Sequence, residues 1–200
     1  MNILFFDTET TGFANLKSTP EDPTQPYLVQ LGTVLMSHTG DVLSQVDLIV
    51  EPDGWIIPSD AEAVHGISQQ MADACGVPLR VVMSIFANLC KKSDVLSAHN
   101  LDFDELIMRA QFHKIAQPEA WNIRAGHLIK VCTMKQATPH CKIPSPHRAG
   151  TYKWPSLEEA SMFYLGKSVS NAHRAMSDCV ALANIFGEMR KRGHIVGVKW

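Results

Sequence analysis

The chain has 200 residues and a mass of 22.1 kDa, which suits one compact domain, and its 46% hydrophobic and 19% charged residues are ordinary globular composition. That balance excludes disordered and fibrous classes, and no apolar run reaches the roughly 18 residues of a membrane-spanning helix. The formal net charge of −2 excludes a protein that coats nucleic acid by bulk positive charge, but it leaves room for a local basic surface.

The N-terminus and the cysteines are typical of a protein in a reducing compartment. The first ten residues lack a basic stretch and reach an acid at Asp7, so no signal peptide is predicted. The five cysteines are scattered, odd in number and never spaced as C-x-x-C, which argues against a disulfide framework and a zinc site. We therefore expect a cytoplasmic protein without a membrane partner.

The first part of the chain predicts an antiparallel start to a sheet. An apolar run over residues 2–7 predicts a buried strand that ends in Asp7. Three prolines and many polar residues at 14–26 predict a loop. The β-rich runs 28–37 and 42–50 flank a short turn that contains glycine, which indicates a hairpin.

The middle of the chain alternates between helical and strand patterns. Helices are predicted near residues 60–64 and 79–91, and 95–99 forms another short buried strand. Apolar residues recur at helical spacing between 102 and 115, and the segment 131–133 resembles a strand end that leads into a helix. Strands mixed with helices in this way indicate an α/β domain.

The C-terminal part predicts a loop, two helices and a tail. Four prolines and little periodicity at 138–155 predict a loop, after which helices are expected at 156–164 and from about His173 to Arg190. We expect the domain to cover residues 1–192, with 193–200 as a short tail.

The most informative stretch holds two acids at the end of the first strand. Asp7 and Glu9 are two residues apart, so on a strand both carboxylates point to the same face. Like charges on one face repel unless a cation lies between them, and hard oxygen ligands suit Mg²⁺ or Mn²⁺. The alternative for an isolated D-x-E is a solvated junction between strand and turn.

Two more acidic sets follow at the ends of other predicted elements. Asp102 and Asp104 come just after the short strand 95–99, and His173 and Asp178 open the last helix. Each set alone is weak evidence for a site, because a lone histidine at a helix start is more often a cap or a surface residue. Together they describe a cluster of carboxylates with one histidine.

These stretches resemble the DEDDh, or DnaQ-like, family of 3′→5′ exonucleases, which includes exonuclease X and the proofreading subunit of DNA polymerase III. The resemblance rests on Asp-Thr-Glu-Thr-Thr-Gly at 7–12, His-Asn-x-x-Phe-Asp at 99–104 and His-x4-Asp at 173–178. Val-His-Gly-Ile-Ser at 64–68 looks like the family's His-Gly-Ile element, and the similarity spans about residues 2–190. It implies an RNase H-like fold with a mixed central sheet, antiparallel first and then parallel, flanked by helices.

The resemblance also implies a catalytic set and its cofactors. The metal ligands would be Asp7, Glu9, Asp104 and Asp178, the general base would be His173, and the cofactors would be two divalent cations, Mg²⁺ with Mn²⁺ as a substitute. The family motif has Phe directly before its acid, which favours Asp104 over Asp102. Asp102 suits a helix N-cap or a first-turn acid.

Residues that contact the 3′ end of the strand are expected near the motifs. They are Thr8, Thr10, Phe13, His65, Ile67 and Phe103. The aromatic and aliphatic members would pack on the last bases, because stacking tolerates any base sequence. Plain core packing explains Phe103 and Ile67 equally well.

One basic segment lies outside the family motifs. Residues 120–157 contain no Asp or Glu, and they include Lys142, Arg148 and Lys153. We expect the loop 138–155 to guide a nucleic-acid strand by charge and stacking, the alternative being an ordinary solvated loop.

The resulting functional hypothesis is a metal-dependent 3′→5′ exonuclease that acts on the 3′ end of DNA and releases nucleoside 5′-monophosphates. The alternatives are the same chemistry on RNA, as in RNase T or oligoribonuclease, and a non-catalytic nucleic-acid-binding module. No motif reads the ribose 2′-hydroxyl, so the sequence favours neither nucleic acid by itself. We expect a stand-alone enzyme or a subunit that docks on a polymerase or repair partner, with the oligomeric state open.

Overall fold

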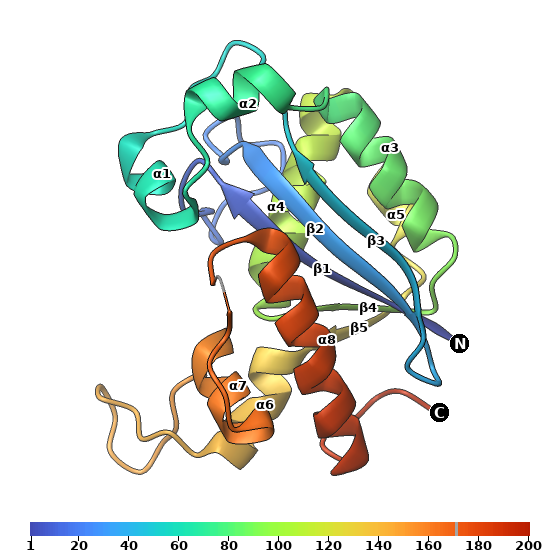
Figure 1. Ribbon diagram of the computed structural model, residues 1–200, viewed down its shortest axis with the longest axis vertical. Helices are drawn as coiled ribbons and strands as arrows, with labels where there is room; N and C mark the ends of the chain where they lie inside the picture. Colours follow the sequence, from blue (N-terminus) through green and yellow to red (C-terminus); the bar gives the residue numbers. More distant parts are fainter. Residues whose placement is uncertain (171) are drawn as a thin grey trace.

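The computed structural model describes residues 1–170 and 172–200, and a single mixed sheet runs through its centre (Figure 1). The strands are β1 (Asn2–Thr10), β2 (Leu28–Ser37), β3 (Val42–Ile49), β4 (Val95–Ala98) and β5 (Ile129–Cys132), in the order β3-β2-β1-β4-β5. β1 pairs antiparallel with β2, and β2 with β3, whereas β1–β4 and β4–β5 are parallel. The predicted α/β class and strand directions are confirmed.

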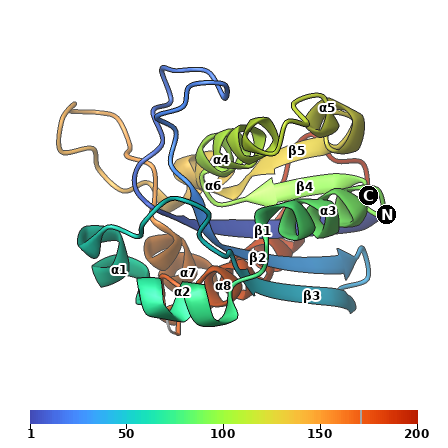
Figure 2. The ribbon, with the colours of Figure 1, turned by 90° about the horizontal axis from the view of Figure 1, so that it is seen from above.

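Helices cover both faces of this sheet (Figure 2). They are α1 (Ser59–His65), α2 (Gln69–Cys75), α3 (Leu79–Cys90), α4 (Leu101–Lys114), α5 (Ala120–Arg124), α6 (Thr133–Cys141), α7 (Leu157–Leu165) and α8 (Ala175–Lys191). No helix of the described residues is both long and apolar enough to cross a bilayer.

The alternation of side chains along β1 builds two cores. Leu4 and Phe6 join the cluster that includes α3 and α4, whereas Ile3 and Phe5 join the cluster that includes α7 and α8. All four side chains are almost fully buried. Because successive residues of a strand face opposite sides, the next acids along β1, Asp7 and Glu9, lie on the face that α8 covers.

The structure corrects some predicted boundaries. The predicted loop 138–155 is wrong at its start, because residues up to Cys141 belong to α6 even though Pro139 lies inside that helix. Buried Ala137 packs in the α7–α8 core, and the amide of Lys142 closes the last turn on the Thr138 carbonyl. Tertiary packing thus outweighs the local cost of a proline. The short helices α2 and α5 were not predicted.

The C-terminal tail is docked onto the domain without regular secondary structure. Ile195 is buried in the α7–α8 core, and Gln136 of α6 exchanges two hydrogen bonds with the backbone of Val196. Arg190 of α8 lies 4.0 Å from the centre of the Trp200 ring. Residues 193–200 therefore cover part of α6 and α8.

Candidate active site

Three carboxylates meet where β1 ends and α8 begins. Asp7 and Glu9 come from β1, Asp178 comes from the first turn of α8, and one oxygen of each lies within 4.8 Å of the others. The two β1 acids share a face of the strand, as the i, i+2 spacing predicts. Residues about 170 positions apart in sequence thus form one acidic cluster.

A glycine in β2 lets α8 approach the sheet this closely. Gly32 is the partner of Asp7 in the β1–β2 ladder. A Cβ on Gly32 would lie 2.6 Å from the nitrogen of Met176 and would overlap the carbonyl of Ala175. The missing side chain therefore decides how close Asp178 comes to Asp7.

We expect Gly32→Ala to lower both stability and activity. The added methyl group forces α8 away from β2, and such overpacking costs about 1–3 kcal/mol of unfolding free energy. Nuclease rate should fall further than stability alone explains, because Asp178 moves with α8. Gly187→Ala, inside α8 with open space around it, is the control and should be neutral or slightly stabilising. Equal effects of both variants on melting temperature and rate would contradict this account.

Asp104 joins the cluster from the first turn of α4. Its Oδ1 accepts a hydrogen bond of 2.7 Å from the Thr8 hydroxyl, and its charge is one cause of the raised pKa of Asp7. The chain enters α4 through Asn100, whose backbone is left-handed with φ 79°. Asp102 instead lies exposed and forms an ion pair of 2.6 Å with Lys135. The two acids of this turn thus have different surroundings, and the buried one is Asp104.

His173 lies in the turn that leads into α8. Its backbone has φ 63°, a conformation that non-glycine residues seldom adopt, and its amide donates a hydrogen bond of 2.9 Å to Oδ2 of Asp178. The side chain is exposed, next to the acidic cluster. Asp178 thereby closes the turn that presents the imidazole, while its own Oδ1 is buried without a hydrogen-bond partner among the described residues.

Burial raises the pKa values of all four acids, and repulsion by neighbouring carboxylates adds to the rise for Asp7, Glu9 and Asp104. For Asp7 burial is the largest cause, followed by the charges of Asp104, Asp178 and Glu9. Burial together with the charge of Asp178 raises the pKa of Glu9 to about 7, and burial raises the pKa of Asp104 to about 8. The pKa of Asp178 is also raised, chiefly by burial.

This donor set fits a hard divalent cation. The cluster is made only of carboxylate oxygens, one of them buried without a partner, and repulsion opposes full ionisation. A cation would supply the missing positive charge and favour the ionised form of each acid. Asp7, Glu9 and Asp178 are the residues placed to share one ion, with Asp104 adjacent to Asp7.

We expect the stability of the cation-free protein to fall as pH rises. An acid whose folded-state pKa is raised binds its proton more tightly when folded, so its contribution is complete below pH 4 and is lost through pH 7 to 8. For each proton that the folded state binds more tightly, the free energy of unfolding falls by about 1.4 kcal/mol per pH unit, which lowers the Tm by on the order of 3 °C. Melting curves in EDTA between pH 5 and 9 test this, and added Mg²⁺ should flatten the slope. A slope unaffected by Mg²⁺ would refute the interpretation.

The predicted substrate contacts differ widely in exposure. Phe13 is 99% exposed, Phe103 is half-buried against the α3–α4 core, and Thr10 is buried with its hydroxyl donating to the Gly12 carbonyl. Ile67 is fully buried in a cluster with Val29, so in this structure it offers no surface to a base. Its burial corrects its prediction as a base contact and matches the core alternative.

His65 is nearly fully buried at the end of α1. Its Nδ1 accepts the amide hydrogen of Ile67 at 3.1 Å, which leaves the ring proton on Nε2. That Nε2 is buried without a hydrogen-bond partner among the described residues. Burial also lowers the pKa of His65, so the imidazole is neutral at physiological pH.

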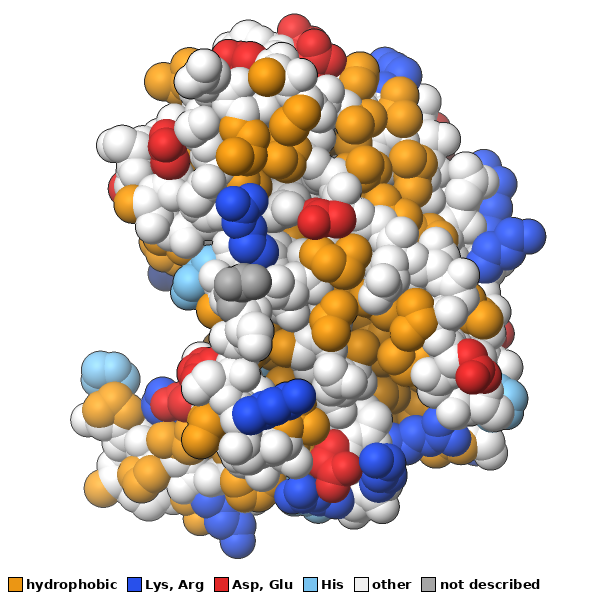
Figure 3. Space-filling view, viewed as in Figure 1, with side chains coloured by type: hydrophobic (Ala, Val, Ile, Leu, Met, Phe, Trp, Pro, Cys, Tyr) orange, Lys and Arg blue, Asp and Glu red, His pale blue; other side chains and the backbone are white. Residues whose placement is uncertain are grey.

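The predicted guiding segment projects beside the site. Its irregular part, 142–155, and α1 flank a hollow, and the turn leading into α8 borders that hollow (Figures 1 and 3). Lys142 and Arg148 are exposed, as are the aromatic rings of Tyr152 and Trp154. Lys153 instead forms an ion pair of 2.6 Å with Glu159 of α7. Two of the three predicted cations are therefore free of ion pairs with the described residues.

Three positioning residues escaped sequence reasoning. Gly32 gave no signal because its role depends on a helix far along the chain. Gln30 of β2 accepts from the Ala175 amide at 3.2 Å, which holds the start of α8 on the sheet. The ring of His99 links α6 and the segment before α7, through contacts of 3.0 Å to the Thr133 hydroxyl and to a backbone carbonyl.

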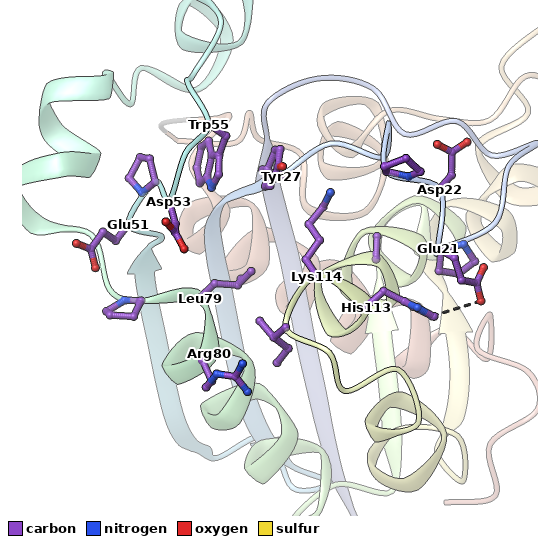
Figure 4. Close-up of a pocket in the computed structure, with 16 residues that line it drawn as sticks. Glu21, Asp22, Tyr27, Glu51, Asp53, Trp55, Leu79, Arg80, His113 and Lys114 are labelled. Atoms are coloured by element: carbon purple, nitrogen blue, oxygen red, sulfur yellow. Dashed lines mark ion pairs between the residues drawn. The ribbon is translucent and has the colours of Figure 1, made fainter.

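A separate cavity of about 770 Å³ lies on the α3–α4 face (Figure 4). Tyr27 stacks on Trp55 with ring centres 5.0 Å apart, and the Lys114 amine lies 4.1 Å from the centre of the Tyr27 ring. Acids and bases both surround this aromatic wall, and Arg80 lies at its lower edge (Figure 4). None of the clustered carboxylates lines this cavity, so it is distinct from the acidic site.

The family model described as exonuclease matches residues 4–186, which include all five residues of the predicted catalytic set. The chain belongs to this 3′→5′ exonuclease family. The DnaQ-like resemblance identified from its motifs is thereby confirmed. No curated protein matches the sequence.

Solved structures of exonuclease I share the fold. The Escherichia coli enzyme in complex with a dT13 oligonucleotide has a TM-score of 0.73 and 21% identity, over 96% of this chain and 41% of that one. The zinc-bound complex of the E. coli enzyme with single-stranded DNA has a TM-score of 0.73 and 22% identity, over 96% of this chain and 40% of that one. The moderately thermophilic enzyme from Methylocaldum szegediense has a TM-score of 0.72 and 16% identity, over 96% of this chain and 40% of that one. The chain thus spans about two fifths of the length of these relatives, and the likeness shows the RNase H-like fold.

Proposed function

We propose that the chain is a divalent-cation-dependent 3′→5′ exonuclease that removes nucleoside 5′-monophosphates from the 3′ end of DNA. The observation that carries this proposal is the convergence of Asp7, Glu9 and Asp178 within 4.8 Å, with Asp104 beside them. Family membership supplies the reaction class. The metal requirement, the number of ions and the base are parts of the proposal.

Four carboxylates would hold two Mg²⁺ ions, or Mn²⁺ in their place. Asp7 would be the central ligand of this set, since the charges of the other three acids all act on it. Bound divalent ions lower the pKa of water and stabilise the attacking and leaving oxygens of a phosphoryl displacement. The Thr8 hydroxyl holds Asp104 in place through its hydrogen bond.

His173 is the proposed general base. Its exposed imidazole, presented by the turn that Asp178 closes, would take a proton from the attacking water as the new phosphorus–oxygen bond forms. The bond between phosphorus and the 3′-oxygen breaks, and that oxygen takes a proton from solvent water and leaves as the hydroxyl of the shortened strand, while His173 returns its proton to solvent. The products are this strand and a nucleoside 5′-monophosphate, so atoms and charge balance.

DNA is the proposed substrate because exonuclease I structures of the same fold hold DNA oligonucleotides. RNA is the second candidate, and discrimination would require a contact to the 2′-hydroxyl. The test is digestion of matched 5′-labelled DNA and RNA oligomers with Mg²⁺ or Mn²⁺, with Asp7→Ala as the inactive control. A ladder that shortens from the 3′ end of DNA supports the proposal. No digestion of either substrate would overturn it.

The segment 142–155 is proposed to guide the strand. Neutralising Lys142 and Arg148 together should raise KM several-fold and flatten its salt dependence, because each phosphate contact contributes to the salt slope. kcat should change little, since neither residue lies in the acidic cluster. Lys92→Gln and Lys199→Gln, which remove two exposed lysines elsewhere, form the control pair. An unchanged KM and salt slope would show that the segment does not touch substrate.

Other features belong to this proposal on the sequence pattern and the resemblance alone. They are a catalytic domain at residues 1–192, a cytoplasmic location and a polymerase or repair partner.

A further inference from the structure

A second cavity lies next to the acidic cluster, between the end of α1 and the start of α8. It measures about 600 Å³. His65 and Gly66 line it from one side, and His173 and Arg174 line it from the other. The proposed base and this cavity thus share a wall.

Arg174 carries the positive charge of this wall. The side chain is half-buried, and its Nη2 lies 3.9 Å from the position that a Cβ on Gly66 would occupy. Its charge partly offsets the rise in the pKa of Glu9 and adds to the burial that lowers the pKa of His65, so the guanidinium is close to both Glu9 and the end of α1. It forms no ion pair with the described residues. Once a cation neutralises Glu9, this charge has no anionic partner in the described part of the chain.

His65 adds a second N–H donor to this wall. Because Nδ1 of His65 accepts the Ile67 amide hydrogen, Nε2 of that ring carries the proton. This Nε2 is buried without a hydrogen-bond partner among the described residues. Asp47 is the one acid that lines the cavity, and its Oδ1 already accepts a hydrogen bond of 2.7 Å from Gln30. The cavity therefore offers N–H donors to an anion with acceptor oxygens.

We propose that Arg174, assisted by Nε2–H of His65, binds a phosphodiester group of the strand on the 5′ side of the bond that is cleaved. This inference rests on the proposed function. In a 3′→5′ exonuclease the terminal nucleotide leaves with the scissile phosphate, so every other phosphate of the strand lies on the 5′ side. The planar guanidinium can donate two parallel hydrogen bonds to the two free oxygens of such a group.

The proposal predicts a dependence on substrate length. The dinucleotide d(TpT) contains only the scissile phosphate, whereas d(TpTpT) contains one phosphate upstream of it. For the wild type, kcat/KM should be roughly ten- to hundredfold higher for the trinucleotide, the range of a charge-assisted hydrogen bond. Arg174→Gln should abolish this gain, so that its kcat/KM values for d(TpTpT) and d(TpT) become equal. Arg174→Lys should retain part of the gain.

Controls separate phosphate binding from a structural role. Arg80→Gln removes an equal charge from the other face of the molecule and should keep the full gain (Figure 4). A neutral methylphosphonate at the upstream linkage of d(TpTpT) should reproduce the effect of Arg174→Gln, and the two changes together should do no more. If Arg174→Gln slows both substrates equally, or if the gain persists, the proposal is wrong.

Strand binding without cleavage distinguishes this inference from the proposed function. A 5′-labelled dT10 strand is titrated with each protein in a buffer that contains Ca²⁺ in place of Mg²⁺. A gel then checks that the strand is still intact. Arg174→Gln should weaken binding roughly tenfold or more relative to wild type and Arg80→Gln. If the strand binds but is not cleaved in Mg²⁺ or Mn²⁺, the proposed activity is overturned. The binding difference between wild type and Arg174→Gln would still decide whether Arg174 contacts a phosphate. Equal binding by all three proteins would overturn the phosphate contact alone.

Discussion

Asp7→Asn is expected to lower kcat/KM roughly a thousandfold or more while the protein remains folded. Asp7 is the acid on which the charges of all three others act, so its loss removes the centre of the cation site. Charge stabilisation by bound cations contributes several kcal/mol to such reactions, and each 1.4 kcal/mol is a factor of ten. Cation binding measured by calorimetry should weaken in parallel. Stability in EDTA at pH 8 should rise, because the substitution removes a buried, repelled carboxylate.

The matched control is Asp102→Asn. Asp102 lies in the same helical turn as Asp104, but it is exposed and paired with Lys135. Exposed ion pairs contribute about 0–1 kcal/mol, so this variant should keep near-wild-type activity and cation affinity. Asp104→Asn, by contrast, should lose most activity. If Asp102→Asn loses activity as severely as Asp7→Asn, the assignment of the second-motif acid is wrong.

His173→Gln should lower kcat by roughly 10²- to 10⁴-fold at neutral pH, the range of general acid–base catalysis. An imidazole accepts a proton only when neutral, so wild-type activity should rise from acidic to mildly alkaline pH. The pKa values of Glu9 and Asp104, raised to about 7 and about 8, fall in the same window. The profile is therefore measured at saturating Mg²⁺, where cation binding favours the ionised carboxylates.

The pH profile separates loss of the base from loss of structure. His173→Gln should flatten the acidic limb that the wild type shows, whereas a merely destabilised protein would keep the same shape at lower amplitude. His127→Gln replaces an exposed histidine and should leave both rate and profile unchanged. A wild-type rate that does not vary between pH 5.5 and 8.5, with chemistry limiting, would remove His173 from the role of base.

Local pattern was enough to predict the elements that carry the proposed catalytic residues. Apolar runs that end in an acid predicted β1, and the hairpin signal predicted β2 and β3. The i, i+2 spacing placed Asp7 and Glu9 on one face, as the structure shows. The three motifs identified the family because their residue types occur in the family's order along the chain, and the family model matches residues 4–186.

Failures of prediction arose where contacts distant in sequence outweigh local preference. Pro139 signalled a loop, yet burial of Ala137 extends α6 past it. Ile67 belongs to a motif that suggested substrate contact, but its side chain fills a core. Lys153 appeared to be free for a phosphate, and Glu159 neutralises it.

The sequence by itself determined the residue types and their order, and through them the family and its class of reaction. It could do so because the spacing of carboxylates and imidazole within each motif is a local property of the chain. Only the tertiary structure decided which acids are buried together, how far their pKa values rise, and that Gly32 admits α8 to the sheet. The physical reason is that burial, repulsion and close packing depend on distances through space. Segments as far apart as Asp7 and Asp178 acquire those distances only when the sheet and its helices assemble.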